Sequence, residues 1–112
     1  MIVKNEAVVF NKATAASESD AYSTSGSNYA YVQVDGTFTA VSIEVEGIMN
    51  DVFDDYLTVG VMDASDGTFD TDIDGKGIYR VDIAAFKKVK FNLKSLTGTD
   101  VTVCARFVNT AI

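Results

Sequence analysis

The chain of 112 residues contains no histidine and no tryptophan, and its only cysteine is Cys104. Histidine is the commonest general base and the usual activator of a serine or cysteine nucleophile, so Ser/His and Cys/His catalysis is excluded within one chain. A single cysteine forms no intramolecular disulfide, and without histidine it lacks partners for a zinc site. Catalysis by carboxylates alone, as in glycoside hydrolysis, stays open, but no spacing of acidic residues demands it. We therefore expect a protein that is not an enzyme and is stabilised by apolar packing.

Long apolar runs and a leader pattern are also missing. No apolar run exceeds four residues, whereas a membrane-spanning helix needs ~20. Residues Met1 to Glu6 lack the cationic segment, apolar run and small-residue cleavage site of a signal peptide. The sequence therefore predicts a soluble protein that has no membrane partner and is not secreted through a signal peptide.

Positive charge is scarce in the first two thirds of the chain. Residues 1–75 hold 14 acids and 2 bases, whereas residues 76–112 hold 2 acids and 7 bases, and the net charge of the whole chain is −7. The acidic balance opposes nucleic-acid binding, because attraction to phosphates supplies most non-specific affinity. A second copy of the chain, or a partner with a basic surface, is easier to accommodate.

What the sequence does contain is the pattern of β-strands. Thr, Val, Ile, Tyr and Phe dominate the apolar set, and Gly, Asp, Asn and Ser cluster about every ten residues. We expect one all-β domain over residues 1–112, an antiparallel β-sandwich of seven to eight strands with a jelly-roll or Ig-like arrangement. The expected strands are Val3 to Phe10, Ala30 to Val34, Thr37 to Glu46, Tyr56 to Met62, Gly77 to Ile83, Lys88 to Leu93 and Val101 to Val108, with a short edge strand near Asp20 to Ser23.

Residues 11–28 are rich in Ala, Ser and Thr, and Tyr22 is their one large apolar side chain. A structureless segment of this length is uncommon inside a compact domain. It is predicted to be either a loop or irregular edge strand, or an arm that lies across a neighbouring subunit.

The strand expected over residues 37–46 and the strand expected over residues 88–93 carry opposite charges on their outward-facing sides. The strand over residues 37–46 changes phase near Thr39 or Ala40, which predicts a β-bulge there. Pairing of the two strands would neutralise both faces, whereas placement on opposite sheets would give an acidic and a basic side and favour head-to-tail contacts between copies. The third interpretation is that the charged sides of both strands are simply exposed to water. The charged interface candidates are Glu44, Glu46, Lys88, Lys90 and Lys94.

Tyr29 and Tyr31 share the phase opposite to Ala30 and Val32, so both are predicted to point outward. Outward tyrosines bind sugars, become buried at subunit contacts, or cover a sheet edge. Cys104 is likewise predicted to lie on the outer strand face. A lone thiol of this kind is usually a packing residue.

The strongest local motif is Asp70-x-Asp72-x-Asp74-Gly75, which matches the first half of a calcium-binding loop. The second half fails, because Val81 stands where a bidentate Glu is required. Turn chemistry, with Ile73 as a buried strand residue, is the alternative. The candidate calcium ligands are Asp63, Asp66, Asp70, Asp72 and Asp74.

Several segments together carry a family resemblance: Val32 to Phe38, Ser42 to Gly47, Gly77 to Ile83, Val89 to Leu93 and Val101 to Val103. This pattern resembles the small β-sandwich virion proteins of tailed bacteriophages that decorate capsids, form head fibres or sit in tail tips. The resemblance implies a structural protein of the virion that is made in the bacterial cytoplasm. It also implies self-assembly, with a trimer favoured, on the capsid exterior or at the tail or connector, and partners such as the major capsid protein. The alternative is a carbohydrate-binding module in which Tyr29, Tyr31 and a calcium-loaded Asp70 loop hold a glycan.

Overall fold

The computed structural model describes residues 1–111. Every regular element in that range is a strand, and no helix there is long and apolar enough to cross a membrane. All the pairings are antiparallel, so the all-β antiparallel prediction is confirmed. The strands are β1 (Ile2–Ala13), β2 (Ser17–Glu18), β3 (Tyr22–Ser23), β4 (Tyr29–Ile48), β5 (Leu57–Val59), β6 (Val61–Asp63), β7 (Phe69–Asp70), β8 (Gly77–Asp82) and β9 (Lys88–Asn109).

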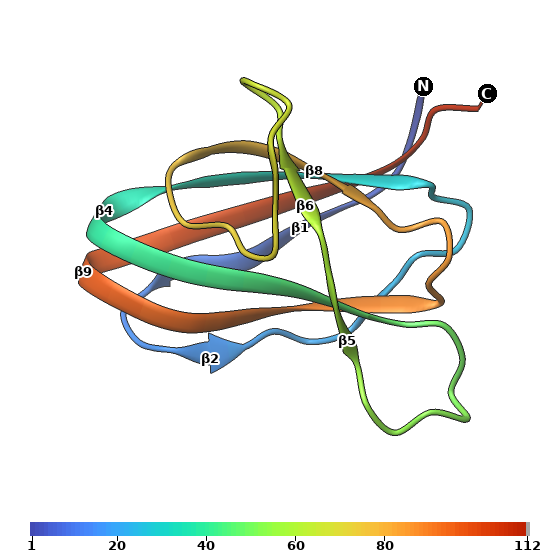
Figure 1. Ribbon diagram of the computed structural model, residues 1–112, viewed down its shortest axis with the longest axis horizontal. Coiled ribbons are helices and arrows are strands. Elements are labelled where there is room, and N and C mark those ends of the chain that lie inside the picture. The colour runs from blue at the N-terminus through green and yellow to red at the C-terminus, as the bar shows by residue number, and fades with distance from the viewer. Residues whose placement is uncertain (112) are drawn as a thin grey trace.

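Two long strands, β4 and β9, organise the molecule. They pair along almost their whole length and then fold over together, so that one half of each strand lies in each of two layers (Figure 1). The larger layer has the order β1-β9-β4-β8-β6-β7, and the smaller layer adds β2 and β3 to β9 and β5 to β4. The result is one open sheet of nine strands folded on itself. The jelly-roll and Ig-like arrangements stay predictions.

The fold of this ribbon depends on bulges and two glycines. The β4–β9 register shifts between Thr37 and Phe38 and between Phe38 and Ala40, as the predicted bulge requires. Gly36 and Gly98 have φ angles of +145° and +146°, a backbone conformation that residues other than glycine rarely adopt. The two chains therefore approach closely at the bend, where a Cβ atom on either glycine would collide with the opposite backbone.

Several expected strand boundaries are wrong, and four of the expected strands are wrong for one shared reason. The strands expected at residues 30–34 and 37–46 are both parts of β4, and those expected at 88–93 and 101–108 are both parts of β9. The glycines that suggested strand ends instead bend continuous strands. The strand expected over residues 56–62 is divided into β5 and β6, and the short strands β2 and β7 were not expected.

Residues 11–28 follow the edge of the chain's own sandwich. β1 continues to Ala13, and both β2 and β3 pair with β9. The ring of Tyr22 lies 6.1 Å from that of Phe91 and 5.8 Å from that of Phe107. This geometry corresponds to the irregular-edge alternative, and the arm across a neighbouring subunit stays a prediction.

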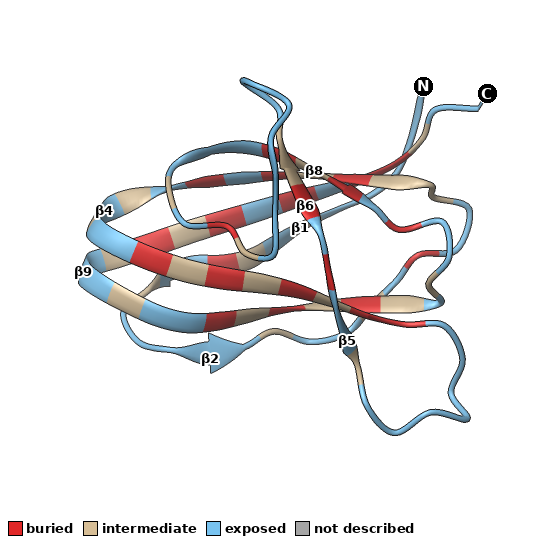
Figure 2. Cartoon of the chain, in the orientation of Figure 1, coloured by how far each residue is buried: buried red, intermediate tan, exposed pale blue. Residues whose placement is uncertain are grey.

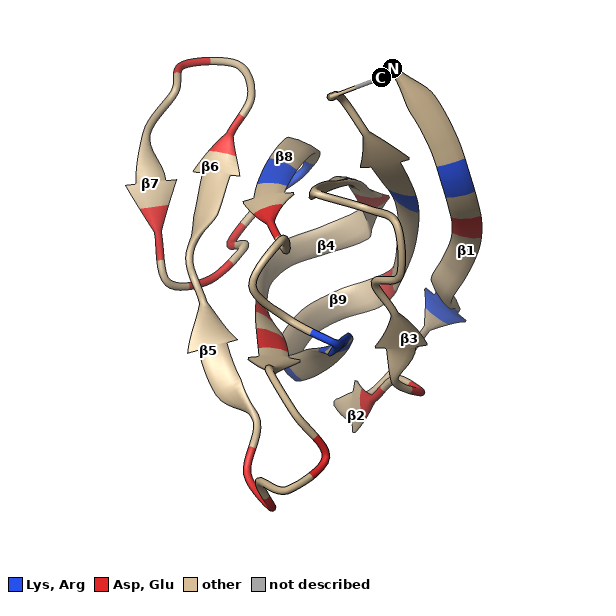
Figure 3. Ribbon diagram, turned by 90° about the vertical axis from the view of Figure 1, so that its right-hand side faces the viewer, with Lys and Arg blue, Asp and Glu red and all other residues tan. Residues whose placement is uncertain are grey.

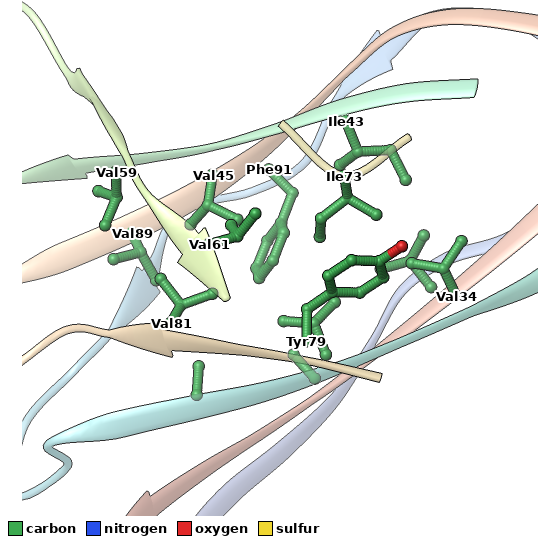
Figure 4. Packing of buried hydrophobic residues seen from close by; sticks show 14 of the residues in the cluster. Val34, Ile43, Val45, Val59, Val61, Ile73, Tyr79, Val81, Val89 and Phe91 are labelled. Carbon is green, nitrogen blue, oxygen red and sulfur yellow. The ribbon is translucent and has the colours of Figure 1, made fainter. Parts of the chain in front are cut away.

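The core lies between the two layers, and buried positions alternate with exposed ones along β4 and β9 (Figure 2). Phe91, Ile43 and Val81 are fully buried at its centre (Figure 4). Ile73 is also fully buried, and its backbone exchanges hydrogen bonds of 2.8 and 2.9 Å with Ile43. The alternative in which Ile73 is a buried strand residue therefore describes this segment correctly.

Tyr79 places one polar group at the core margin, and this makes a pH dependence predictable. Its hydroxyl donates a 2.9 Å hydrogen bond to the Gly75 carbonyl, and burial, with smaller contributions from nearby carboxylates, raises the pKa of Tyr79 above its ordinary value. Stability from the neutral phenol is fully present below the unfolded pKa of about 10 and is lost as pH rises through the folded pKa.

We therefore expect the free energy of unfolding in urea to fall above pH 10, and to fall less in Tyr79→Phe. Tyr22, whose pKa burial also raises, remains in both proteins and serves as an internal reference. Identical slopes for the two proteins between pH 9 and pH 11 would contradict the assignment to Tyr79.

Candidate functional site on the outer face of the larger layer

A continuous row of outward side chains crosses all six strands of the larger layer. Each member is the register partner of the next, and the residues beside them in sequence, such as Val32 and Phe107, are buried. Strand alternation therefore turns the whole row away from the core. The row, from β1 to β7, consists of Glu6, Arg106, Tyr31, Arg80, Met62 and Phe69.

A second, more apolar row lies beside it. Val8 pairs with Cys104, Cys104 with Gln33, and Gln33 with Ile78. Val8 and Ile78 are 60% and 49% exposed, and Cys104 is exposed as predicted. Together with Tyr31, these side chains line an open hollow of about 770 Å³, which we call the outer-face depression.

Two arginines lie on this outer face, and Arg106 lines the depression. Arg106 forms a 2.8 Å ion pair with Glu6, and both side chains are more than half exposed, so the pair contributes little to stability. The guanidinium of Arg80 lies 4.7 Å above the ring of Tyr29, which is a cation–π contact. Arg80 makes no ion pair with any residue from 1 to 111, so its charge is available to a partner.

Tyr29 and Tyr31 both point outward and are half-buried. The predicted phase is therefore correct. Arg80 covers one face of Tyr29, so the two rings do not form a pair of open stacking platforms. Tyr31 instead lines the depression.

The charged interface candidates lie on the opposite layer. Glu46 is the register partner of Lys90, and Glu44 accepts a 3.0 Å hydrogen bond from Lys94. Lys88 lies 3.6 Å from Asp51. The two strands pair, so the alternative of opposite sheets is wrong (Figure 3). Among these residues only Glu44 and Lys94 form an ion pair between the two strands, because Lys90 pairs with Glu18 and one carboxylate oxygen of Glu46 is buried without a hydrogen-bond partner among the described residues. The predicted interface set is divided between two faces of the molecule.

The candidate calcium ligands serve local turns. Asp63 accepts hydrogen bonds from the amide and hydroxyl of Ser65, and Asp66 accepts them from the amide and hydroxyl of Thr68. The bonds from Thr68 lower the pKa of Asp66. Ser42 donates a 2.7 Å hydrogen bond to Asp72. No group of three acidic, histidine or cysteine side chains within residues 1–111 is arranged to hold a metal ion, so the geometry gives the calcium prediction no support.

One exposed apolar feature was not predicted from the sequence. Residues 49–57, which we call the β4–β5 loop, connect β4 to the start of β5 and project from one end of the sandwich (Figures 1 and 3). Met49, Val52, Phe53 and Leu57 are 62%, 82%, 59% and 70% exposed. The available signal was the Val-Phe pair set among acidic residues, a combination that neither a buried strand nor an ordinary turn requires.

One carboxylate of this loop is held in place. Lys87 donates a 2.5 Å hydrogen bond to Asp51, and this bond is the main reason why the pKa of Asp51 is lowered. Asp54 and Asp55 are exposed and have no ion pair among the described residues. The loop therefore presents apolar side chains beside two uncompensated negative charges.

A family model described as XepA matches residues 4–106. Among solved structures, the SPBc2 prophage-derived protein YomS aligns with a TM-score of 0.84 and 22% identity over 97% of this chain and 96% of that protein. The PBSX exported protein XepA aligns with a TM-score of 0.86 and 24% identity over 94% of this chain, which spans 37% of the length of that protein. No curated protein matches.

These comparisons correct the expected localisation. The family carries the name of a protein described as exported, so the prediction of a protein that is not secreted is wrong. The missing apolar run at the N-terminus was therefore not a valid guide to localisation.

Proposed function

The chain belongs to the XepA family, and we propose that it is a non-enzymatic structural module of a phage, which assembles with copies of itself through the outer face of its larger layer. The prophage origin given for YomS and the family match support the association with a phage. The lack of histidine supports a role without catalysis. By analogy with the exported XepA protein, we further propose that the module acts after export.

The observation that carries the proposal is the outer-face depression. Its lining combines exposed Val8, Ile78 and Cys104 with Tyr31 and Arg106. Subunit interfaces have apolar centres and are enriched in tyrosine and arginine. A surface of this composition is better explained by association than by exposure to water.

The test is the mass of the purified chain by light scattering at low and high salt. We expect a closed oligomer, with a trimer favoured, that persists at high salt because its contacts are mainly apolar. The double variant Tyr31→Ser/Ile78→Ser, which we call the face variant, is expected to be monomeric with an unchanged β-sheet circular dichroism spectrum.

The matched control is Glu44→Ser/Lys94→Ser, which removes an ion pair from the opposite layer and should leave the mass unchanged. A wild-type chain that is monomeric at every concentration and salt level would contradict the proposal. In that case the carbohydrate-binding alternative would become the leading one.

A further inference from the structure

We propose that the β4–β5 loop has two positions, and that Asp51 is the latch that holds it in the extended one, out of an apolar hollow in its own chain. Three features support this proposal: the hollow itself, the exposed apolar side chains at its edge, and a carboxylate that ties the loop to two lysines. The proposal concerns a single chain and does not depend on the proposed function.

The hollow is formed by the loop together with the end of the sandwich, and its volume is about 550 Å³. Its lining includes buried Ile48 and the ring of Phe86. That ring occupies the space beside Gly47, where an added Cβ atom would lie 2.6 Å from it. Met49 and Leu57 of the loop complete the apolar lining. A hollow of this size encloses small molecules in other proteins, so it can receive an aromatic side chain.

Two apolar side chains stand at the edge of the hollow without entering it. Val52 and Phe53 belong to its lining, yet they are 82% and 59% exposed. Moving Phe53 inward would remove its own surface and that of the lining from water, which is favourable. The amides of both residues donate hydrogen bonds to Asn50, of 3.0 and 3.1 Å. These bonds lie within the loop, so they fix its shape but not its position relative to the sandwich.

Asp51 fixes that position through two lysines. One of its carboxylate oxygens accepts a 2.5 Å hydrogen bond from Lys87, and the other lies 3.6 Å from the ammonium group of Lys88. The lysines are themselves placed by strand pairing, because the Lys87 amide donates a 2.8 Å hydrogen bond to the Ile48 carbonyl and Lys88 is the register partner of Ile48. A contact at two points on a fixed backbone therefore holds the loop in its extended position.

The latch is weak enough to be released. The Asp51 and Lys87 side chains are 54% and 55% exposed, and ion pairs between exposed side chains contribute little and are screened by salt. The inward movement of one partly exposed ring gains a similarly small free energy. When two positions of a loop differ so little, a single contact decides which is populated. The amount of apolar surface at this end of the sandwich therefore depends on ionic strength.

The test is a fluorescent reporter at position 53. The chain contains no tryptophan, so Phe53→Trp gives a single emission, measured in the face variant at a concentration where light scattering gives the mass of one chain. Adding Asp51→Asn should move the emission to shorter wavelength and lower its quenching by acrylamide about twofold or more, because the ring enters the hollow. Sodium chloride at about 1 M should have the same effect while Asp51 is present, and no further effect after Asp51→Asn.

Two further variants separate the latch from a general effect of charge. Glu6→Gln removes an ion pair with Arg106 whose side chains are 59% and 55% exposed, a close match in exposure, and it should leave the reporter unchanged. Leu57→Ser makes the lining of the hollow more polar and should reverse most of the change caused by Asp51→Asn. A reporter that is unaffected by Asp51→Asn and by salt, or that becomes more exposed, would overturn the proposal. An equal response to Glu6→Gln would overturn it as well, and neither result would alter the mass measurement that tests the proposed function.

Discussion

Replacing Gly36 with alanine should destabilise the protein by about 3 kcal/mol, since a strained backbone conformation and a steric collision combine at this position. Its φ angle is +145°, and an added Cβ would lie 2.4 Å from the carbonyl oxygen of Asp100. That oxygen belongs to the backbone of the paired strand β9, so it cannot move without disrupting the bend. In thermal unfolding, the midpoint should fall by roughly 10–20 °C.

Gly67→Ala is the matched control. Gly67 also has a positive φ, +75°, but an added Cβ would meet nothing within 4 Å. Only the backbone cost of roughly 1 kcal/mol remains there. An equal loss in the two variants would show that the close approach at the bend is not the source of the effect. Gly98→Ala, with its added Cβ 2.4 Å from the Cα of Phe38, should resemble Gly36→Ala.

The same bend explains what the sequence could and could not specify. Alternation identified the inward residues of both halves of β4, and the phase change near Ala40 located the bulge. The Asp35-Gly36 pair, however, has the same local signature whether the chain turns back or bends as a continuous strand. That choice is made by pairing with Gly98 and its neighbours, about sixty residues away along the chain.

For the candidate site too, one part could be predicted from the sequence and another part could not. The outward direction of Tyr31 follows from alternation, but its position beside Val8, Cys104 and Ile78 follows from the order β1-β9-β4-β8. No local pattern specifies that order, which depends on which edges pair. For the same reason, the charge asymmetry along the chain left open whether the acidic and basic strands pair or lie on opposite sheets, and β4 and β9 do pair.

The exposure of the β4–β5 loop was missed for a different reason, although the Val-Phe pair among acidic residues gave a local signal. Its apolar side chains have no strand partner, and the exposure of Phe53 depends on where the sandwich ends. Hydrophobic residues in a sequence normally predict burial. The exposed apolar side chains of this loop depart from that rule, and the departure becomes visible only once the core is seen to be complete without them.

Phe91→Ala is expected to be the most damaging substitution in the core, with a loss of about 3–5 kcal/mol. The ring is fully buried and lies among Val45, Val61 and Ile73 from three other segments (Figure 4). Its removal leaves a cavity that these side chains, fixed to different strands, cannot fill by a local shift. For a domain whose total stability is about 5–15 kcal/mol, the measured urea midpoint should drop by roughly a fifth or more.

The residue also ties the irregular edge to the sandwich, which gives the variant a second readout. The rings of Phe91 and Tyr22 form an edge-to-face contact with centroids 6.1 Å apart, and the backbone of Phe91 exchanges hydrogen bonds with Ser19. Loss of the ring should therefore speed hydrogen exchange in residues 17–23 more than in β8. Phe69→Ala, which truncates a side chain that is 74% exposed, should change stability by less than about 0.5 kcal/mol. If the two variants were equally stable, burial of Phe91 would not be what holds the layers and their edge together.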